Sequence, residues 1–256
     1  MKAIFIVGYW NSGTTLLVDI LRKHPQICLR RARFKPNLEE RTLAKILRKM
    51  GTGFISLESD YATVIREGFV NYREPRFDAE TREKFRKIFD RKFAVSPDQT
   101  LLLKNPWLFF MPDFIDQNFA SDDLKKIIIL RDGPGQIVSK DYWKRNLENP
   151  EQQLYARAKF WVRSMEYFFE KWHQKPNTLT LRYENFCHNP IAFTRNICDF
   201  AQVSQPHKFI TPIPLQFSNR QTNWNQLNPA YRDNVNAIIK DMQTKLDLHF
   251  PVFEGK

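Results

Sequence analysis

Residues 8–15, Gly-Tyr-Trp-Asn-Ser-Gly-Thr-Thr, contain two glycines, Gly8 and Gly13, and three small hydroxyl side chains. A short apolar run at 3–7 precedes the loop, and apolar residues at helical spacing follow it from 14 to 23. A strand, loop and helix in this order can wrap an anion with backbone amides at the helix N-terminus. A glycine turn that merely joins the strand to the helix is the alternative. The flanking elements favour the anion site, as do the hydroxyls of Ser12, Thr14 and Thr15.

The loop lacks the lysine that nucleoside triphosphatases use. In their Gly-x4-Gly-Lys-Ser/Thr loop, the lysine reaches the β- and γ-phosphates and the next hydroxyl binds magnesium. Thr14 occupies the position of that lysine here. The loop therefore suits a ligand with a 5′-phosphate, no γ-phosphate and no metal, and an adenylyl phosphosulfate is such a ligand. A rival interpretation, a P-loop kinase with Asp132 as a magnesium ligand, conflicts with the missing lysine.

A second candidate anion site follows another apolar run. Arg131 ends the run at 127–130, and Ser139 comes eight residues later in the next predicted helix. An arginine at the carboxyl end of a strand and a hydroxyl on the adjacent helix can converge on one phosphate. The alternatives are a surface ion pair of Arg131 with Asp132 or Asp141, and a hydrogen bond of Ser139 to its own helix. Two anion sites on one sheet match a ligand with separate 5′ and 3′ anionic groups.

Predicted strands and helices alternate along the chain. Four short apolar runs are the predicted strands, at 3–7, 101–103, 127–130 and 178–181. A long helix with an apolar stripe is predicted at 151–172. This alternation predicts an α/β fold, an open and mostly parallel sheet flanked by helices, in which ligands lie at the carboxyl ends of the strands.

The length of 256 residues predicts a single domain over 1–256. Residues 30–99 show no clear strand but have helical stretches near 39–50 and 78–89, and we interpret them as a helical insertion that covers the site. Basic residues cluster between 30 and 49. This cluster is either a solvated, salt-bridged helix face or a cleft for an acidic acceptor.

The formal net charge of +12 implies a surface that attracts anions. Nucleic acid is not expected as the partner, because the sequence has no zinc-finger spacing, no aromatic RNP-like box and no tail of pure Lys/Arg. Three widely spaced cysteines indicate neither a disulfide framework nor a zinc site, and they predict buried thiols in a reducing compartment. The run at 3–7 is too short for a signal peptide or a membrane span, so a cytoplasmic protein is expected.

The segment Gly8–Leu17, with His24-Pro25 after it, resembles the 5′-phosphosulfate loop of the sulfotransferase family that uses 3′-phosphoadenosine-5′-phosphosulfate (PAPS). Arg131 and Ser139 resemble that family's 3′-phosphate motif. The resemblance runs from Phe5 to about Leu246 and is weak over 30–99, where acceptors would be chosen. It implies a P-loop-like enzyme that moves a sulfuryl group from PAPS to a hydroxyl or amine of a small-molecule or glycan acceptor, leaving 3′,5′-ADP.

The resemblance also implies which residues bind the cofactor. Arg182-Tyr183-Glu184-Asn185-Phe186 is similar to a family segment whose tyrosine reaches the adenine, although a tyrosine packed on the sheet edge is the alternative. Arg220, ahead of Trp224, is similar to a basic residue that closes over the 3′-phosphate, and a solvent-exposed arginine is the alternative. The implied cofactor residues are Asn11, Ser12, Gly13, Thr14, Thr15, Arg131, Ser139, Tyr183 and Arg220.

Catalysis needs a positive group near the leaving phosphate, and most family members have Lys or Arg where this chain has Asn11. Lys104, in a Lys-x-Pro segment at a strand end, resembles a family lysine that faces the sulfuryl group; a lysine in solvent is the alternative. Asn11 is the second candidate as a neutral donor. Candidates for the general base are Glu39, Glu40 and Asp60, in that order, whereas His24 is interpreted as a turn residue. The family's soluble members also have a histidine after the position of Lys104, and this chain has none there. Together with Asn11, this leaves open a module that binds the cofactor but has weakened catalysis.

Overall fold

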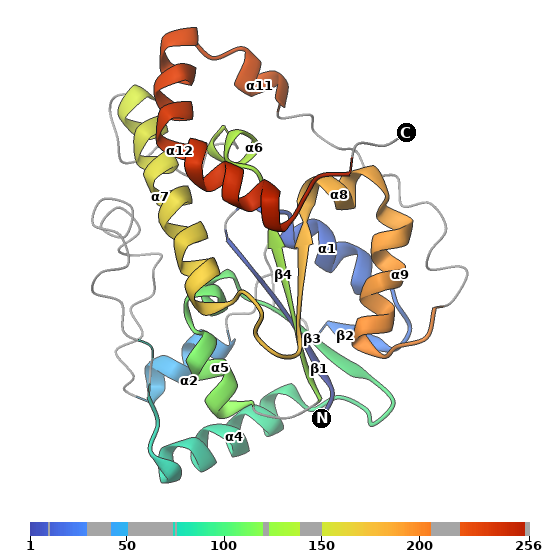
Figure 1. Cartoon of the computed structure of the whole chain (residues 1–256). Coiled ribbons are helices and arrows are strands. Elements are labelled where there is room, and N and C mark those ends of the chain that lie inside the picture. The colour runs from blue at the N-terminus through green and yellow to red at the C-terminus, as the bar shows by residue number, and fades with distance from the viewer. Residues whose placement is uncertain are drawn as a thin grey trace.

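A computed structural model of the chain describes residues 1–9, 11–29, 42–50, 74, 76–119, 123–138, 150–205 and 221–253. Its centre is a five-stranded parallel sheet with helices on both faces (Figure 1). The strand order is β2-β3-β1-β4-β5, and every neighbouring pair is parallel. The strands are β1 (Ala3–Gly8), β2 (Ile27–Leu29), β3 (Thr100–Lys104), β4 (Leu124–Leu130) and β5 (Thr178–Arg182). The predicted α/β fold is confirmed.

The continuous apolar run of β1 exists because both faces of this central strand are buried. Ile4 and Ile6 point into one apolar core, and Phe5 and Val7 point into the other. This alternation follows from the two-residue period of a strand, which sends successive side chains to opposite faces. Both cores therefore depend on β1, and β1 leads directly into the predicted anion loop.

Helices cover the two faces of the sheet unequally (Figure 1). The smaller core packs under three helices, α1 (Thr14–Leu21), α8 (Tyr183–His188) and α9 (Pro190–Ala201). The larger core packs under α2 (Thr42–Lys49), α4 (Ala79–Phe93), the 3-10 helix η1 (Pro106–Phe110), α5 (Pro112–Asn118), α6 (Gly133–Ile137), α7 (Pro150–Lys171), α11 (Gln221–Asn225) and α12 (Pro229–His249). None of these described helices is long and apolar enough to cross a membrane.

The predicted elements match the structure except at one strand. Strand β2 was not predicted, because Ile27–Leu29 is only three residues long and two of the three are only partly buried. The long helix predicted at 151–172 is α7, whose stripe of Trp161, Met165 and Phe168 is buried. Within 30–99, the described residues include the two predicted helices, as α2 and α4.

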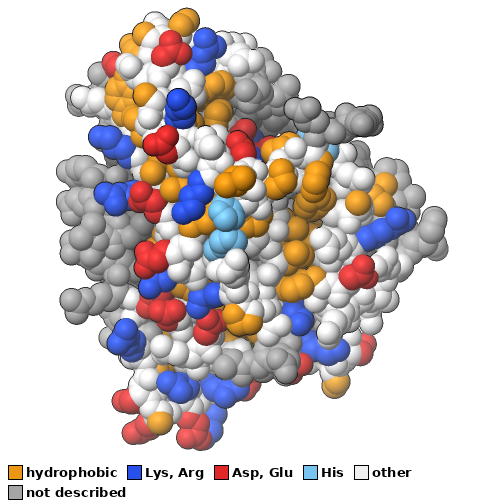
Figure 2. Space-filling view, viewed as in Figure 1, with side chains coloured by type: hydrophobic (Ala, Val, Ile, Leu, Met, Phe, Trp, Pro, Cys, Tyr) orange, Lys and Arg blue, Asp and Glu red, His pale blue; other side chains and the backbone are white. Residues whose placement is uncertain are grey.

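Charged side chains are mixed on the face seen in Figure 2, where Lys and Arg alternate with Asp and Glu over the described elements. In the basic cluster between 30 and 49, Lys45 and Lys49 are exposed on α2, opposite the buried Leu43, Ile46 and Leu47. A solvated helix face explains these two lysines. Residues 30–41 of the cluster lie outside the described part of the chain.

Candidate active site

Parallel pairing brings the predicted site residues to one edge of the sheet. The register pairs Ile6 of β1 with Lys104 at the end of β3. It also pairs Leu130 of β4 with Arg182 of β5, so the next residues, Arg131 and Tyr183, leave the sheet side by side. The loop after β1 starts at this same carboxyl edge.

The loop has the backbone conformation of an anion cradle. Gly13 has φ 105° and directly precedes helix α1, and Asn11 has φ 60°. The N-cap residue Gly13 has no side chain that could cap α1, and the first turn of the helix has no acidic residue. The first amides of the helix and its dipole therefore favour a negative group at this end of α1.

Ser12 supplies a second sign of a ligand at the loop. Its side chain is fully buried, and its Oγ has no hydrogen-bond partner among the described residues. A buried hydroxyl without a partner costs free energy, so such groups are uncommon unless they serve a ligand or a water. The hydroxyl suits a phosphate oxygen, as predicted for this residue.

Gly13 also allows Tyr183 to approach the loop. A Cβ atom built on Gly13 would lie 2.4 Å from Cδ2 of the Tyr183 ring, and the backbone of Gly13 is left-handed. Tyr183 is half-buried and also packs against the smaller core. The ring therefore lies between the loop and the helices that cover this face of the sheet.

Gly13→Ala is expected to lower the melting temperature, because alanine would both strain the backbone and clash with the Tyr183 ring. The left-handed conformation alone costs about 1–2 kcal/mol. For a chain of this size, that cost corresponds to a fall of roughly 2–8 °C in thermal unfolding. The double variant Gly13→Ala/Tyr183→Ala removes the clash and keeps the strain. A Gly13→Ala protein with the same melting temperature as the parent would contradict this loop conformation.

Lys104 lies inside the site. Its side chain is 2% exposed, and its Nζ donates a hydrogen bond of 2.7 Å to Oγ1 of Thr15, in the first turn of α1. The alternative of a lysine in solvent is therefore wrong. The contact brings an ammonium group to the helix end where the loop amides meet.

Arg131 connects the two predicted anion sites. Its guanidinium donates a hydrogen bond of 3.0 Å to the carbonyl oxygen of Asn11, and its Cζ lies 4.3 Å from the centre of the Tyr183 ring. The residue is 6% exposed, and its Nε has no hydrogen-bond partner among the described residues. A surface ion pair with Asp132 is therefore wrong, and Asp141 lies outside the described residues.

The Asp132 carboxylate is used within the fold. Its Oδ1 accepts a hydrogen bond of 2.8 Å from the Gly135 amide at the start of α6. Burial raises the pKa of Asp132, and the nearby Glu184 carboxylate raises it further. Among the described residues, no group of three His, Cys, Asp or Glu side chains could hold a metal ion.

His24 is a turn residue, as predicted. Its ring is 2% exposed, Nδ1 accepts the Gln26 amide at 3.1 Å, and Nε2 lies 2.8 Å from the carbonyl oxygen of Ser204. These contacts join the turn after α1 to the segment that follows α9. Several predicted site residues lie outside the described part of the chain, namely Glu39, Glu40, Asp60, Ser139 and Arg220.

The polar side chains that hold the turn after Arg131 were not predicted as site residues. Glu184 accepts the Asp132 amide, and Gln243 of α12 accepts the Gly133 amide. Glu184 stands beside Tyr183 in a segment already singled out, so its position was a usable signal. No sequence spacing points to Gln243, which is 110 residues from its partner.

The parallel sheet, the loop before α1 and the arginine after β4 define an α/β protein whose candidate anion loop lacks the triphosphatase lysine. A family model described as the sulfotransferase family matches residues 3–207, and the chain belongs to that family. The sulfotransferase prediction is confirmed, and neither the kinase nor the weakened binding module is favoured. A search of curated proteins returns no match.

Solved sulfotransferases share the fold. A sulfotransferase from Alicyclobacillus acidocaldarius is 15% identical with a TM-score of 0.53, and the match covers 99% of this chain and 97% of that one. A sulfotransferase from Mycobacterium avium is 12% identical with a TM-score of 0.57, and the match covers 98% of this chain and 78% of that one. A mouse sulfotransferase complexed with PAP is 13% identical with a TM-score of 0.52, and the match covers 97% of this chain and 88% of that one. At these identities the likeness concerns the fold.

Proposed function

We propose that this sulfotransferase takes its sulfuryl group from PAPS and binds the donor at the carboxyl edge of the sheet, within a single domain spanning 1–256. The observation that carries the proposal is the hydrogen bond between Arg131 and the carbonyl oxygen of Asn11. This contact joins the two candidate anion sites, so one ligand with 5′ and 3′ anionic groups can meet both. The Ser12 hydroxyl, which has no hydrogen-bond partner in the described part of the chain, and the glycine N-cap of α1 support the same donor.

Each residue has a proposed part in holding the donor. Ser12, Gly13, Thr14 and Thr15 receive the 5′-phosphosulfate with amides and hydroxyls. Arg131 receives the 3′-phosphate with a directional, charged donor, and Ser139 and Arg220 are proposed to assist it. The Tyr183 ring, already packed on the guanidinium of Arg131, is proposed to contact the adenine with its face.

The donor supplies a sulfuryl group attached to a phosphate leaving group, and in-line displacement places negative charge on the bridging oxygen. Lys104 is proposed to stabilise that charge, because its ammonium group touches Thr15 at the end of the loop. The Asn11 side chain is proposed as a weaker donor to the same oxygen, because its amide is neutral. The backbone carbonyl oxygen of Asn11 accepts the hydrogen bond from Arg131. Glu39 and Glu40 remain the proposed general bases.

The proposed acceptor is a hydroxyl or amine of a small molecule or a glycan. We also propose a cytoplasmic location. Cys28, Cys187 and Cys198 are free thiols, which is compatible with a reducing compartment, but only Cys198 is buried as predicted, and the other two are partly exposed. Burial raises the pKa of Cys187 and of Cys198 to about 11, so neither thiol is readily ionised at neutral pH.

The protein is expected to bind 3′,5′-ADP without metal, and more tightly than ATP with magnesium. The 3′-phosphate gains a charged hydrogen bond to Arg131 that ATP cannot form, and such a bond contributes about 1.5–3 kcal/mol, or at least tenfold in affinity. Calorimetry with and without EDTA measures both ligands. Tighter, magnesium-dependent binding of ATP would overturn the proposed function.

A further inference from the structure

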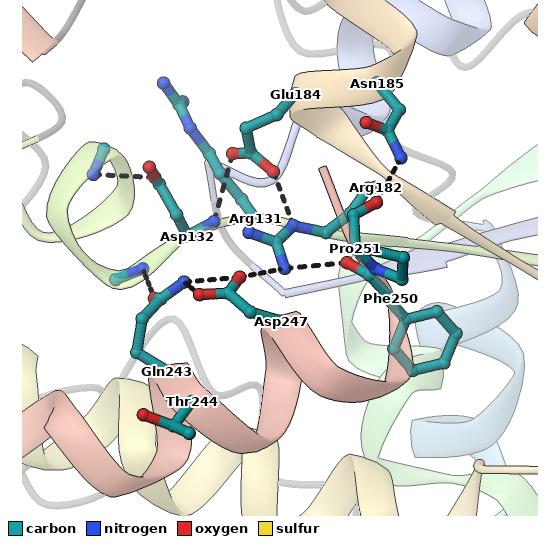
Figure 3. A network of polar contacts seen from close by, with 12 residues as sticks. Arg131, Asp132, Arg182, Glu184, Asn185, Gln243, Thr244, Asp247, Phe250 and Pro251 are labelled. Atoms are coloured by element: carbon teal, nitrogen blue, oxygen red, sulfur yellow. Dashed lines mark hydrogen bonds and ion pairs between the residues drawn. The ribbon is translucent and has the colours of Figure 1, made fainter. Parts of the chain in front are cut away.

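The two residues after Arg131 are held by side chains from other elements (Figure 3). The Asp132 amide donates a hydrogen bond of 3.1 Å to Oε1 of Glu184, which lies on α8. The Gly133 amide donates one of 3.0 Å to Oε1 of Gln243, which lies on α12. The backbone that carries Arg131 out of the sheet is therefore anchored on two sides.

These two anchors are joined into a closed ring of polar contacts (Figure 3). Arg182 Nε lies 2.7 Å from Oε2 of Glu184, and another nitrogen of the same guanidinium lies 2.9 Å from Oδ1 of Asp247. Gln243 Nε2 donates to the same Asp247 oxygen at 3.0 Å. Asp247 is thus an acceptor that Arg182 and Gln243 share, and it closes the ring between α8 and α12.

The ring also compensates the charge of Arg182, which donates to the Phe250 carbonyl oxygen at 3.2 Å as well. The Arg182 side chain is 2% exposed, and a buried cation is costly unless its partners compensate it. Glu184 and Asp247 neutralise Arg182 from opposite sides. Arg131 contacts neither Glu184 nor Asp247 in this ring; its guanidinium bonds to the Asn11 carbonyl oxygen and lies over the Tyr183 ring, and the Asp132 carboxylate is also close enough to interact with its charge.

The C-terminal segment holds α8 through separate contacts. Asn185 Nδ2 donates to the Pro251 carbonyl oxygen at 2.8 Å, and the Phe253 amide donates to Oδ1 of Asn185 at 2.8 Å. The start of α8, with Tyr183, is therefore anchored even without Asp247. A change at Asp247 should act mainly on the turn after Arg131.

We propose that Asp247 is a positioning residue of the nucleotide site: by holding Arg182 and Gln243, it fixes the turn at 132–133 and thereby the direction of Arg131. This role rests on the proposed function, since it assigns Arg131 to the 3′-phosphate. Without Asp247, the Gln243 side chain loses the contact that orients it, and the Gly133 amide loses its anchor. Arg131 then samples other directions, which weakens the 3′-phosphate contact and leaves the chemistry of the loop intact.

Amide hydrogen exchange in the ligand-free protein tests the structural half of the proposal. In Asp247→Ala, the amides of Asp132 and Gly133 are expected to exchange about tenfold faster or more, whereas amides of β1 keep their rates. Asp241→Ala is the matched control, because Asp241 is an exposed carboxylate on the same helix. Unchanged exchange at both amides in Asp247→Ala would overturn the proposal.

Calorimetry tests the functional half. Asp247→Ala is expected to weaken 3′,5′-ADP about tenfold, with 5′-AMP affinity and turnover at saturating PAPS within about twofold of the parent. Asp247→Asn keeps an acceptor oxygen and should recover most of the affinity. If Asp247→Ala does not fold, Gln243→Ala replaces it, because this variant leaves Arg182 paired with Glu184 and Asp247. It should lower the affinity for 3′,5′-ADP in the same selective way.

The outcomes separate the two proposals. A parent protein that binds no 3′,5′-ADP would overturn the proposed function. A parent that binds it, beside an Asp247→Ala variant that binds it equally well, would overturn only the positioning role. Equal losses for 3′,5′-ADP and 5′-AMP would also overturn it, since the ring would then act on the whole site rather than on Arg131.

Discussion

Lys104→Ala is expected to lower the single-turnover rate of sulfuryl transfer by roughly a hundredfold or more, the scale of removing one preorganised donor. Lys104 is buried, and its ammonium group contacts Thr15 at the start of α1. It can therefore stabilise charge on the leaving oxygen without reorganising. The affinity for 3′,5′-ADP should change far less, because the loop amides and Arg131 still bind the two phosphates. Rates with saturating PAPS isolate the chemical step.

Three variants make this result specific. Lys104→Met keeps most of the side-chain volume, so it separates the loss of charge from the creation of a cavity. Lys126→Ala removes another buried lysine, which pairs with Asp116 at 2.7 Å and precedes the carboxyl end of β4. It should lower stability and leave the rate near that of the parent. Asn11→Ala should be milder than Lys104→Ala, because a neutral donor stabilises the developing charge less. A Lys104→Ala protein that reacts as fast as the parent would exclude Lys104 as the charge donor.

Arg131→Ala is expected to weaken 3′,5′-ADP selectively. Loss of a charged hydrogen bond costs about 1.5–3 kcal/mol, which is roughly 10- to 150-fold in affinity. The affinity for 5′-AMP, which has no 3′-phosphate, should stay within about threefold of the parent. Calorimetric titration of both nucleotides measures the difference.

The contacts of Arg131 determine its controls. Because its guanidinium also bonds to Asn11 and lies over Tyr183, Arg131→Lys is informative: it keeps the charge but loses the planar fork, and it should give an intermediate loss. Arg195→Ala removes an exposed arginine on α9 and should change neither affinity. Equal losses for both nucleotides in Arg131→Ala would place this arginine away from the 3′-phosphate.

Much of the fold follows from local pattern. The four predicted strands and the long helix are present, because buried parallel strands need continuous apolar runs and a packed helix needs an apolar stripe. Strand β2 was not predicted, because Ile27–Leu29 owes its pairing to β3 rather than to its own composition. Lys104 and Arg131 could be placed near one edge, since residues that end parallel strands meet there.

The sequence by itself determined the β1, loop and α1 unit, the absence of the triphosphatase lysine and the strand ends that carry Lys104 and Arg131. These features depend on neighbouring residues, whose spacing sets strand, turn and helix. Only the tertiary structure decided that Arg131 reaches the Asn11 carbonyl, 120 positions away, and that Tyr183 packs on Gly13. It also decided that α12 supports the turn after Arg131. Such contacts join segments that are brought together by the packing of the whole sheet and its helices, and no local spacing encodes them.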